Sequence, residues 1–276
     1  MKVMFSPRKL ILYTFLVIGA ITALFPFFWM ITSSFKMTNE IAQYPPNIFP
    51  SKFTFSNYEY VFQTMNVFRV LGNSAVVSAS TVLLNAFFSG LVAYALTKLI
   101  FPGKKQLFIL VLAFMMIPGQ LMIVPLFMQM NRMHLLGTYA AMILPGAISS
   151  FSIFLLRQSM VSLPDDYIEA AQIDGANHVF IFFRIVVPMI VPILLTVILI
   201  NFFWSWNSYL WPMMVTVGHD EMATIQVALD RYRTLHSAKW GATMAGCVLT
   251  AAPIVVLYLF LQKQFIESIA MSGIKG

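Results

Sequence analysis

One short stretch of the sequence, residues 163–180, gathers acidic side chains between two strongly apolar runs. It holds four of the ten acidic residues of the chain: Asp165, Asp166, Glu169 and Asp174. On a helix, small side chains at Ala170, Ala171 and Gly175 would let another backbone approach closely, beside the acidic Asp174. The stretch is therefore either a docking helix, with Glu169 as an exposed anchor for a basic residue of a partner, or an amphipathic loop helix that lies on its own bundle.

The ends of this helix are marked by side chains that satisfy backbone groups. Ser162 and Asp165 have the spacing of a capping box, and Pro164 suits a first helical position because it lacks the N–H that would be unpaired there. We therefore expect the helix to begin at about Pro164. Asp165 and Asp166 would favour its positive end, and Gly175 can take the left-handed conformation that ends a helix.

Polar and aromatic side chains also gather in the fifth long apolar run. Four of them could line a path for a substrate, because polar groups and aromatic faces can hold a polar solute: Asn201, Trp204, Asn207 and Tyr209. An asparagine that faced lipid would be costly, so these amides favour a bundle interior or a cavity. An aromatic belt with hydrogen bonds between helices would give the same pattern. Asn85 and Gln120 have the same ambiguity.

Several kinds of chemistry lack their motifs in this chain. There is no G-x-x-x-x-G-K-[ST] sequence, so the chain does not by itself bind and hydrolyse ATP in the usual way. The four histidines are too isolated to predict a metal site. The middles of the apolar runs hold no ionisable residue, which argues against a proton-coupled or sodium-coupled carrier and against a membrane-embedded hydrolase. Lys and Arg are scattered at the edges of these runs, unlike a nucleic-acid-binding face.

The composition explains what must position these residues. Of 276 residues, 59% are hydrophobic and 10% charged, whereas soluble domains are about one quarter charged. Each span needs roughly 20 apolar residues. We predict an all-α membrane protein whose residues 1–276 form a single transmembrane domain with six helices, kinked by internal prolines around a cavity. The spans are expected at about 10–35, 70–97, 106–130, 138–157, 185–215 and 240–262.

The orientation follows from the loops. The first apolar run continues to about Phe35, which is too long for a removable signal and predicts a retained span. With both termini in the cytoplasm, ten of the 17 Lys and Arg residues lie inside and seven outside, in agreement with the positive-inside rule. The acidic loop, about 161–184, is then cytoplasmic.

At this point the sequence "EAAQIDGANHVFIFFRIVVP" resembles a known family. It is similar to the EAA loop in permease subunits of binding-protein-dependent ABC importers. The pattern falls on Glu169, Ala170, Ala171, Gly175 and Pro188, with Asp174 before the glycine as is common in the carbohydrate branch. "FPFFWMITSSFK", "WSWNSYLWPMM" and the C-terminal "QKQFIESIAMSGIKG" also resemble carbohydrate importer permeases of the second maltose permease type.

The resemblance implies a type I importer permease in a bacterial or archaeal cell membrane. It implies a heterodimer with a second permease, two copies of an ABC ATPase that hold ATP and Mg, and an extracytoplasmic solute-binding protein. Glu169, Ala170, Ala171, Asp174 and Gly175 would couple the permease to the ATPase. The tail residues Gly273, Lys275 and Gly276 would reach towards the ATPase dimer. Two alternatives stay open: a permease for glycerol phosphate or a polyol, and a non-transporting membrane scaffold.

Overall fold

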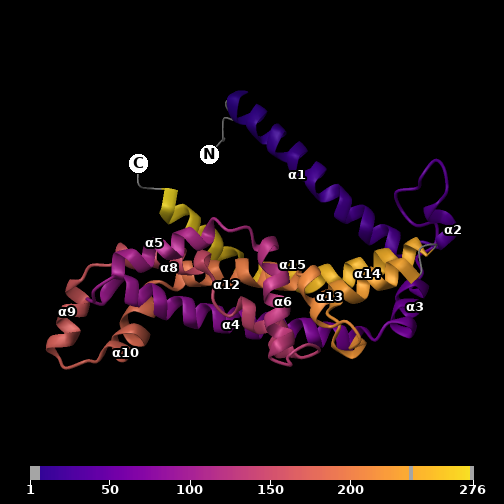
Figure 1. The fold of residues 1–276 in the computed structure, drawn as a ribbon. Helices are drawn as coiled ribbons and strands as arrows, with labels where there is room; N and C mark the ends of the chain where they lie inside the picture. Colours follow the sequence, from indigo (N-terminus) through magenta and orange to yellow (C-terminus); the bar gives the residue numbers. More distant parts are fainter. Residues whose placement is uncertain (1–6, 236–238, 274–276) are drawn as a thin grey trace. The chain divides into compact units, whose positions relative to one another are not determined.

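The computed structural model describes residues 7–235 and 239–273, and every regular element in these ranges is helical (Figure 1). The predicted all-α class is therefore confirmed. The chain divides into two compact units, which are described separately. Unit 1 comprises residues 1–67 and 228–252, and unit 2 comprises residues 68–227 and 253–276.

Unit 1 contains one long apolar helix and a short, well-packed segment that follows it. Its complete helices are α1 (Pro7–Ser34), α2 (Thr38–Ile41) and α3 (Ser56–Thr64). It also contains part of α14 (Ile225–Leu235) and the beginning of α15 (Trp240–Gly273), which continue into unit 2. The buried Asn57 of α3 donates hydrogen bonds to the carbonyls of Ser34 (2.9 Å) and Lys36 (2.7 Å). These bonds satisfy carbonyls that the end of α1 leaves without a helical partner.

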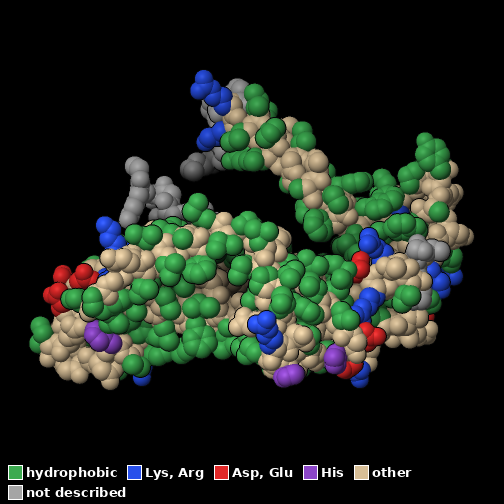
Figure 2. Space-filling view, viewed as in Figure 1, with side chains coloured by type: hydrophobic (Ala, Val, Ile, Leu, Met, Phe, Trp, Pro, Cys, Tyr) green, Lys and Arg blue, Asp and Glu red, His purple; other side chains and the backbone are tan. Residues whose placement is uncertain are grey.

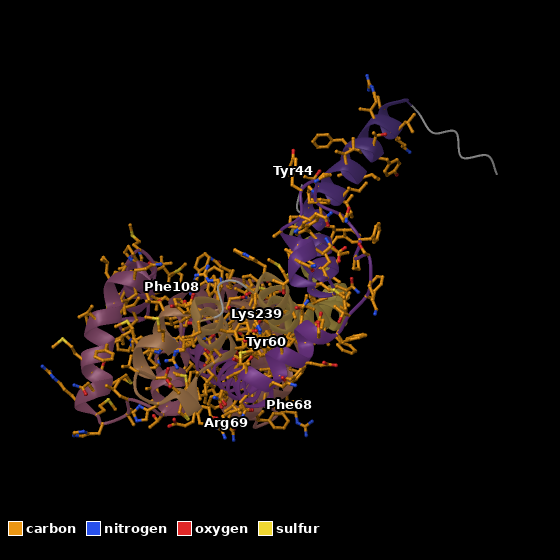
Figure 3. The ribbon with its side chains drawn as sticks, turned by 90° about the vertical axis from the view of Figure 1, so that its right-hand side faces the viewer. Tyr44, Tyr60, Phe68, Arg69, Phe108 and Lys239 are labelled. Atoms are coloured by element: carbon orange, nitrogen blue, oxygen red, sulfur yellow. The ribbon has the colours of Figure 1, made fainter. Side chains whose placement is uncertain are left out.

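Two cations of unit 1 lie against aromatic rings. The Lys36 ammonium is 4.2 Å from the centre of the Trp29 ring and donates to the Asn47 carbonyl. Burial lowers the pKa of Lys36 below its ordinary value, and the nearby Glu40 opposes this shift. Lys239 lies 3.5 Å from the centre of the Tyr60 ring, and Figure 3 shows the two side chains together. The first contact holds the segment after α1 against that helix, and the second holds the residue before α15 against α3.

Unit 2 holds the remaining helices around a core at one end of α4. The elements are α4 (Val67–Lys98), α5 (Lys104–Met115), η1 (Gly119–Met122), α6 (Ile123–Arg132), α7 (Tyr139–Ile143), η2 (Leu144–Gly146), α8 (Ser150–Val161), α9 (Asp166–Ile173), α10 (His178–Ile181), the π-helical η3 (Phe182–Val186), α11 (Val187–Met189), α12 (Val191–Trp206), α13 (Leu210–Val215) and η4 (Asp220–Met222). A buried cluster joins α4, α8, α9 and α12 through residues such as Tyr94, Leu156, Ile168 and Val197. Figure 1 shows α9 and α10 at the end of unit 2 where this cluster lies.

Among the described residues, three helices are each long and apolar enough to cross a membrane, and three bent pairs of helices meet the same criteria when each pair is taken as one segment. The single helices are Arg8–Ser34, Val67–Lys98 and Trp240–Phe260. The pairs are Lys104–Met115 with Gly119–Arg132, Tyr139–Gly146 with Ser150–Val161, and His178–Met189 with Val191–Trp206, bent by 94°, 42° and 83°. Counted as one span each, the pairs give the six spans that the sequence predicts.

Prolines account for the positions of these bends. Pro118 lies in the first break, Pro145 lies in η2 shortly before the second, and Pro188 and Pro192 flank the third. Proline cannot donate the helical hydrogen bond and clashes with the preceding turn. Prolines do not always interrupt a helix, however, because α15 continues through Pro253. The fifth apolar run also differs from the expected 185–215, since α12 ends at Trp206 and α13 follows as a separate helix.

Candidate functional site

The acidic stretch forms α9, but its beginning differs from the expected one. The helix begins at Asp166, and the preceding Asp165 makes no side-chain capping bond. The Ser162 hydroxyl instead donates to the Ser159 carbonyl (2.7 Å) at the end of α8. The predicted capping box is therefore wrong: Ser162 still belongs to the preceding helix, and the Asp165 carboxylate is used by a lysine from α4.

The end of α9 agrees with the sequence prediction. Gly175 has a φ of 83°, in the left-handed region. Its N–H donates to the Gln172 carbonyl (3.0 Å), and the Ala176 N–H donates to the Ala171 carbonyl (2.9 Å). These two bonds form a Schellman motif, which satisfies the last carbonyls of the helix and turns the chain sharply.

The five residues predicted for coupling do not share one face. Glu169, Ala170, Asp174 and Gly175 are exposed. Ala171 is partly buried and packs against the unit 2 core, beside the buried Ile168. A side chain added at Gly175 would meet no atom within 4 Å, so space for a partner exists there. Figure 2 shows acidic side chains gathered over α9.

Apolar side chains surround these acids, and the sequence reasoning missed them. Tyr167, Ile173, Val179 and Phe180 are 56%, 86%, 66% and 52% exposed, respectively. A mixture of exposed apolar and acidic groups is typical of a surface that another protein covers. The sequence did contain a signal for this apolar surface. Ile173 and Val179 lie on either side of Gly175, where a loop exposed only to solvent would have polar residues.

Lys98, the last residue of α4, fixes α9 in place. Its ammonium donates to the Leu163 carbonyl (2.8 Å) and to the Asp165 carboxylate (2.5 Å). The Lys98 side chain is only 4% exposed, whereas that of Asp165 is 70% exposed. On α10, the His178 ring makes a second link to α4 through the Tyr94 hydroxyl, 3.0 Å away. Both links connect the loop to the same long helix.

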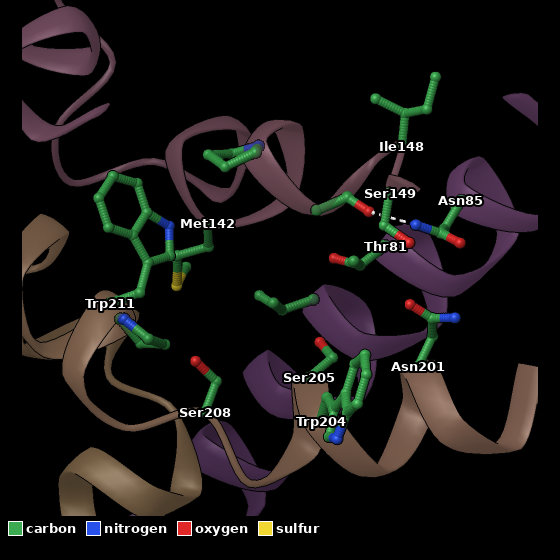
Figure 4. A pocket seen from close by; sticks show the side chains of 14 residues that line it. Thr81, Asn85, Met142, Ile148, Ser149, Asn201, Trp204, Ser205, Ser208 and Trp211 are labelled. Carbon is green, nitrogen blue, oxygen red and sulfur yellow. Dashed lines mark hydrogen bonds between the residues drawn. The ribbon is translucent and has the colours of Figure 1, made fainter. Parts of the chain in front are cut away.

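A cavity of about 260 Å³ lies elsewhere in unit 2, between α4, the α7–η2 segment, α12 and α13. Its lining residues combine hydroxyls, amides and tryptophans, and Figure 4 shows them: Val77, Thr81, Asn85, Met142, Pro145, Gly146, Ile148, Ser149, Asn201, Trp204, Ser205, Ser208, Trp211 and Pro212. Asn85 is 1% exposed and donates to the Gly146 carbonyl (3.0 Å). Asn201 donates to the Ser152 hydroxyl (3.0 Å) and to the Val197 carbonyl (2.8 Å).

The cavity contains two of the four residues predicted for a substrate path. Asn201 and Trp204 line it, whereas Asn207 and Tyr209 do not. The exposed Asn207 donates to the Phe203 carbonyl (2.8 Å), which completes the end of α12, and accepts a hydrogen bond from Gln226 (3.2 Å). The alternative of hydrogen bonding within and between helices therefore describes Asn207 better.

The sequence reasoning missed most of the polar wall that α4 supplies. Five polar residues on α4 are buried at spacings of three or four: Ser74, Ser78, Thr81, Asn85 and Ser89. This periodicity places them on one face of the helix. A polar stripe in an otherwise apolar span was a visible signal that the helix faces a protein interior or a cavity rather than lipid.

The remaining predicted sites lie at the end of the chain. Gly273 is the last residue of α15. Lys275 and Gly276 lie outside the described residues. Among the described residues, no three His, Cys, Asp or Glu side chains gather as metal ligands would.

Comparison with known proteins connects these features to a family. Residues 86–270 match the model of the binding-protein-dependent transport system inner membrane component. The arabinooligosaccharides transport system permease protein AraQ of Halalkalibacterium halodurans is 35% identical over 93% of this chain and 93% of its own. The AraQ protein of Bacillus subtilis is 32% identical over 99% and 98%, respectively. The diacetylchitobiose uptake system permease protein NgcG of Streptomyces coelicolor is 31% identical over 94% and 86%.

Solved structures show the same fold. A chain of a bacterial ABC transporter involved in the import of the acidic polysaccharide alginate superposes with a TM-score of 0.83 and 23% identity, covering 96% of this chain and 100% of its own. With a family match across two thirds of its length and relatives that cover nearly all of it, this multi-pass membrane chain belongs to the family of inner membrane components of binding-protein-dependent transport systems.

Proposed function

We propose that this chain is one permease subunit of an ATP-driven importer for a sugar or oligosaccharide. The relatives named for arabinooligosaccharides and diacetylchitobiose support a carbohydrate substrate. The full importer would contain a second permease, two copies of an ABC ATPase and an extracytoplasmic solute-binding protein. A structural neighbour was solved in complex with its periplasmic binding protein, which supports the last of these partners.

The observation that carries the coupling proposal is the exposed end of α9. Glu169 and Ala170 are exposed on α9, Asp174 and Gly175 are exposed in the sharp turn that follows it, and exposed apolar residues surround them. We propose that this surface seats in the ATPase, with Glu169 opposite a basic residue. Ala171 lies on the other side of α9, where it packs the helix against the buried cluster of unit 2.

The chemistry of ATP hydrolysis would belong to the partner. ATP and Mg would be bound by the ATPase subunits, and this chain would supply the path and the docking helix. The tail residues Gly273, Lys275 and Gly276 would approach the ATPase dimer from the cytoplasmic side. The permease would then change between inward-facing and outward-facing states as the ATPase dimer closes and opens.

Two substitutions on α9 test the docking role in the reconstituted complex. Glu169→Lys places a cation opposite the proposed basic contact, and Gly175→Val fills the open space at the turn. We expect Glu169→Lys to reduce ATP hydrolysis stimulated by the loaded binding protein at least fivefold, because close charge pairs at interfaces can contribute 1.5 kcal/mol or more, a factor of about ten. Gly175→Val should also reduce it, because its side chain would occupy the open space that the partner needs.

Gly103→Val is the matched control for the glycine. Gly103 has a φ of 82°, nearly that of Gly175, and a side chain added there also meets no atom within 4 Å. The backbone strain is thus comparable, but Gly103 lies directly before α5, whereas Gly175 lies in the turn that follows α9. Normal coupling in both α9 variants, or an equal defect in Gly103→Val, would refute the docking role. The alternative function, a non-transporting membrane scaffold, predicts a different result: the complex would bind the ATPase but would transport no sugar.

A further inference from the structure

Two cations of unit 2 lie together where α5 begins and α8 ends. Lys104 is the first residue of α5, and Arg157 lies one turn before the end of α8, which packs against α5 (Figure 1). The Arg157 guanidinium is 3.7 Å from the centre of the Phe108 ring, one helical turn from Lys104. The charge of Arg157 acts on Lys104, as does that of Lys98 at the end of α4. Three positive charges therefore gather at adjacent ends of three helices.

The nearby carboxylate of Asp165 does not neutralise this group. It lies close enough to act on Lys104, but it already accepts a hydrogen bond from Lys98, and its side chain is 70% exposed. The first turn of α5 holds no acidic residue, although negative charge is favoured at the N-terminus of a helix. Neither Lys104 nor Arg157 makes a salt bridge with a described residue. An excess of positive charge therefore remains.

Both cations keep donors for a further partner. The Lys104 ammonium donates to the carbonyls of Thr97 (2.6 Å) and Leu99 (2.9 Å), so one of its three N–H groups remains. The Nε atom of Arg157 is buried, whereas its two terminal nitrogens are accessible and bond to no described residue. The carbonyls of α4 and the ring of Phe108 already hold both side chains in place. A phosphate group can therefore bridge them at little cost in side-chain entropy.

A row of apolar side chains continues from these cations along α5. Leu107, Leu110 and Phe114 follow Lys104 at spacings of three and four, which make them neighbours on the helix surface. They are 47%, 51% and 52% exposed, respectively, and they belong to a bent pair of helices that is apolar enough to cross a membrane. A ligand with an anionic head and an apolar tail covers both parts. Free phosphate would leave the apolar row uncovered.

We infer that Lys104 and Arg157 bind the phosphate of an anionic phospholipid in the membrane leaflet on the side of α9, with an acyl chain along Leu107, Leu110 and Phe114. Basic pockets between membrane helices bind phospholipid head groups. The planar fork of an arginine matches two phosphate oxygens. Phe108 positions that fork. The inference needs only the membrane location of the chain and is independent of the substrate that the importer carries.

The test counts lipids bound to the complete purified importer by native mass spectrometry. The probes are palmitoyl-oleoyl phosphatidylglycerol and, with the same chains but no net charge, palmitoyl-oleoyl phosphatidylcholine. We expect tighter binding of phosphatidylglycerol. Arg157→Gln and Lys104→Gln should each weaken this binding about fivefold, the factor for the roughly 1 kcal/mol that one Lys or Arg contributes near an anionic lipid surface. Neither should change the binding of phosphatidylcholine, and Arg157→Lys, which keeps the charge, should weaken phosphatidylglycerol binding less than Arg157→Gln.

Arg132→Gln is the matched control, because Arg132 is an exposed arginine at the end of another apolar helix of unit 2, α6. The substitution removes the same charge and should leave the binding of phosphatidylglycerol unchanged. Equal binding of the two lipids to the unsubstituted importer, or an equal loss in Arg132→Gln and Arg157→Gln, would overturn the inference. Displacement of bound phosphatidylglycerol by an excess of inorganic phosphate would identify a site for free anions and would likewise overturn it.

Discussion

At the scale of single residues, Lys98 shows how a buried cation can stabilise a loop. It holds the Leu163 carbonyl and the Asp165 carboxylate together at the end of α4. Lys98→Met would leave that carbonyl without its donor, at a cost of about 1–3 kcal/mol. For a domain of this size we expect the melting temperature of the purified protein to fall by about 2–4 °C per kcal/mol.

Two further variants separate the contributions of the two contacts. Asp165→Asn should cost less than about 1 kcal/mol, because exposed ion pairs contribute little and the Asp165 side chain is 70% exposed. Lys105→Met removes the same charge from an exposed neighbouring position and should leave the melting temperature unchanged. A loss in Lys105→Met equal to that in Lys98→Met would show that the lost charge, rather than the bond to Leu163, destabilises the variant. A loss in Asp165→Asn equal to that in Lys98→Met would instead assign the stability to the ion pair.

At the scale of elements, the beginning of α15 packs tightly against α3 within unit 1. A side chain added at Gly241 would lie 2.6 Å from the amide nitrogen of Asn57. Gly241→Ala would therefore displace the amide that bonds to the carbonyls of Ser34 and Lys36. We expect thermal unfolding of this variant to begin several degrees lower, because each lost buried bond costs about 1–3 kcal/mol.

Gly72→Ala is the comparison for this prediction. Gly72 is also helical, but an added side chain would meet no atom within 4 Å. Alanine is the better helix former by about 1 kcal/mol, so the melting temperature should stay the same or rise. If Gly241→Ala is as stable as Gly72→Ala, the close approach of α3 and α15 is not needed for stability.

The elements also show how far the sequence alone could lead. Hydrophobic run length predicts where apolar helices lie, and Gly175 predicts the end of α9, because only local geometry matters for both. The beginning of α9 was missed because Asp165 bonds to Lys98, 67 residues away. Sequence also could not predict which polar residues line the cavity and which complete a helix end, because distant partners decide this too. Asn201 and Asn207 are six positions apart on one apolar run, but Asn201 bonds to Ser152 and Asn207 bonds to Gln226.

At the scale of the whole molecule, the number of membrane crossings depends on the three bent pairs. Each pair could be one broken span, or it could enter and leave the membrane on one side. Six crossings with both termini in the cytoplasm would place α9 on the side of an ATPase. The loop between α6 and α7 distinguishes the two possibilities, because it follows one bent pair and precedes the next.

Cysteine labelling measures this directly, since Cys247 is the single cysteine of the sequence. In a Cys247→Ala background, one cysteine is introduced at a time at five exposed positions: Lys52, Lys105, Arg132, Gln172 and Leu235. With six crossings, a membrane-impermeant maleimide should label positions 52, 132 and 235 in intact spheroplasts, and positions 105 and 172 only after lysis. If the pair formed by α5 and α6 returned to the same side, position 132 would behave like position 105. If the whole pattern were reversed, α9 would lie outside the cell and could not contact an ATPase.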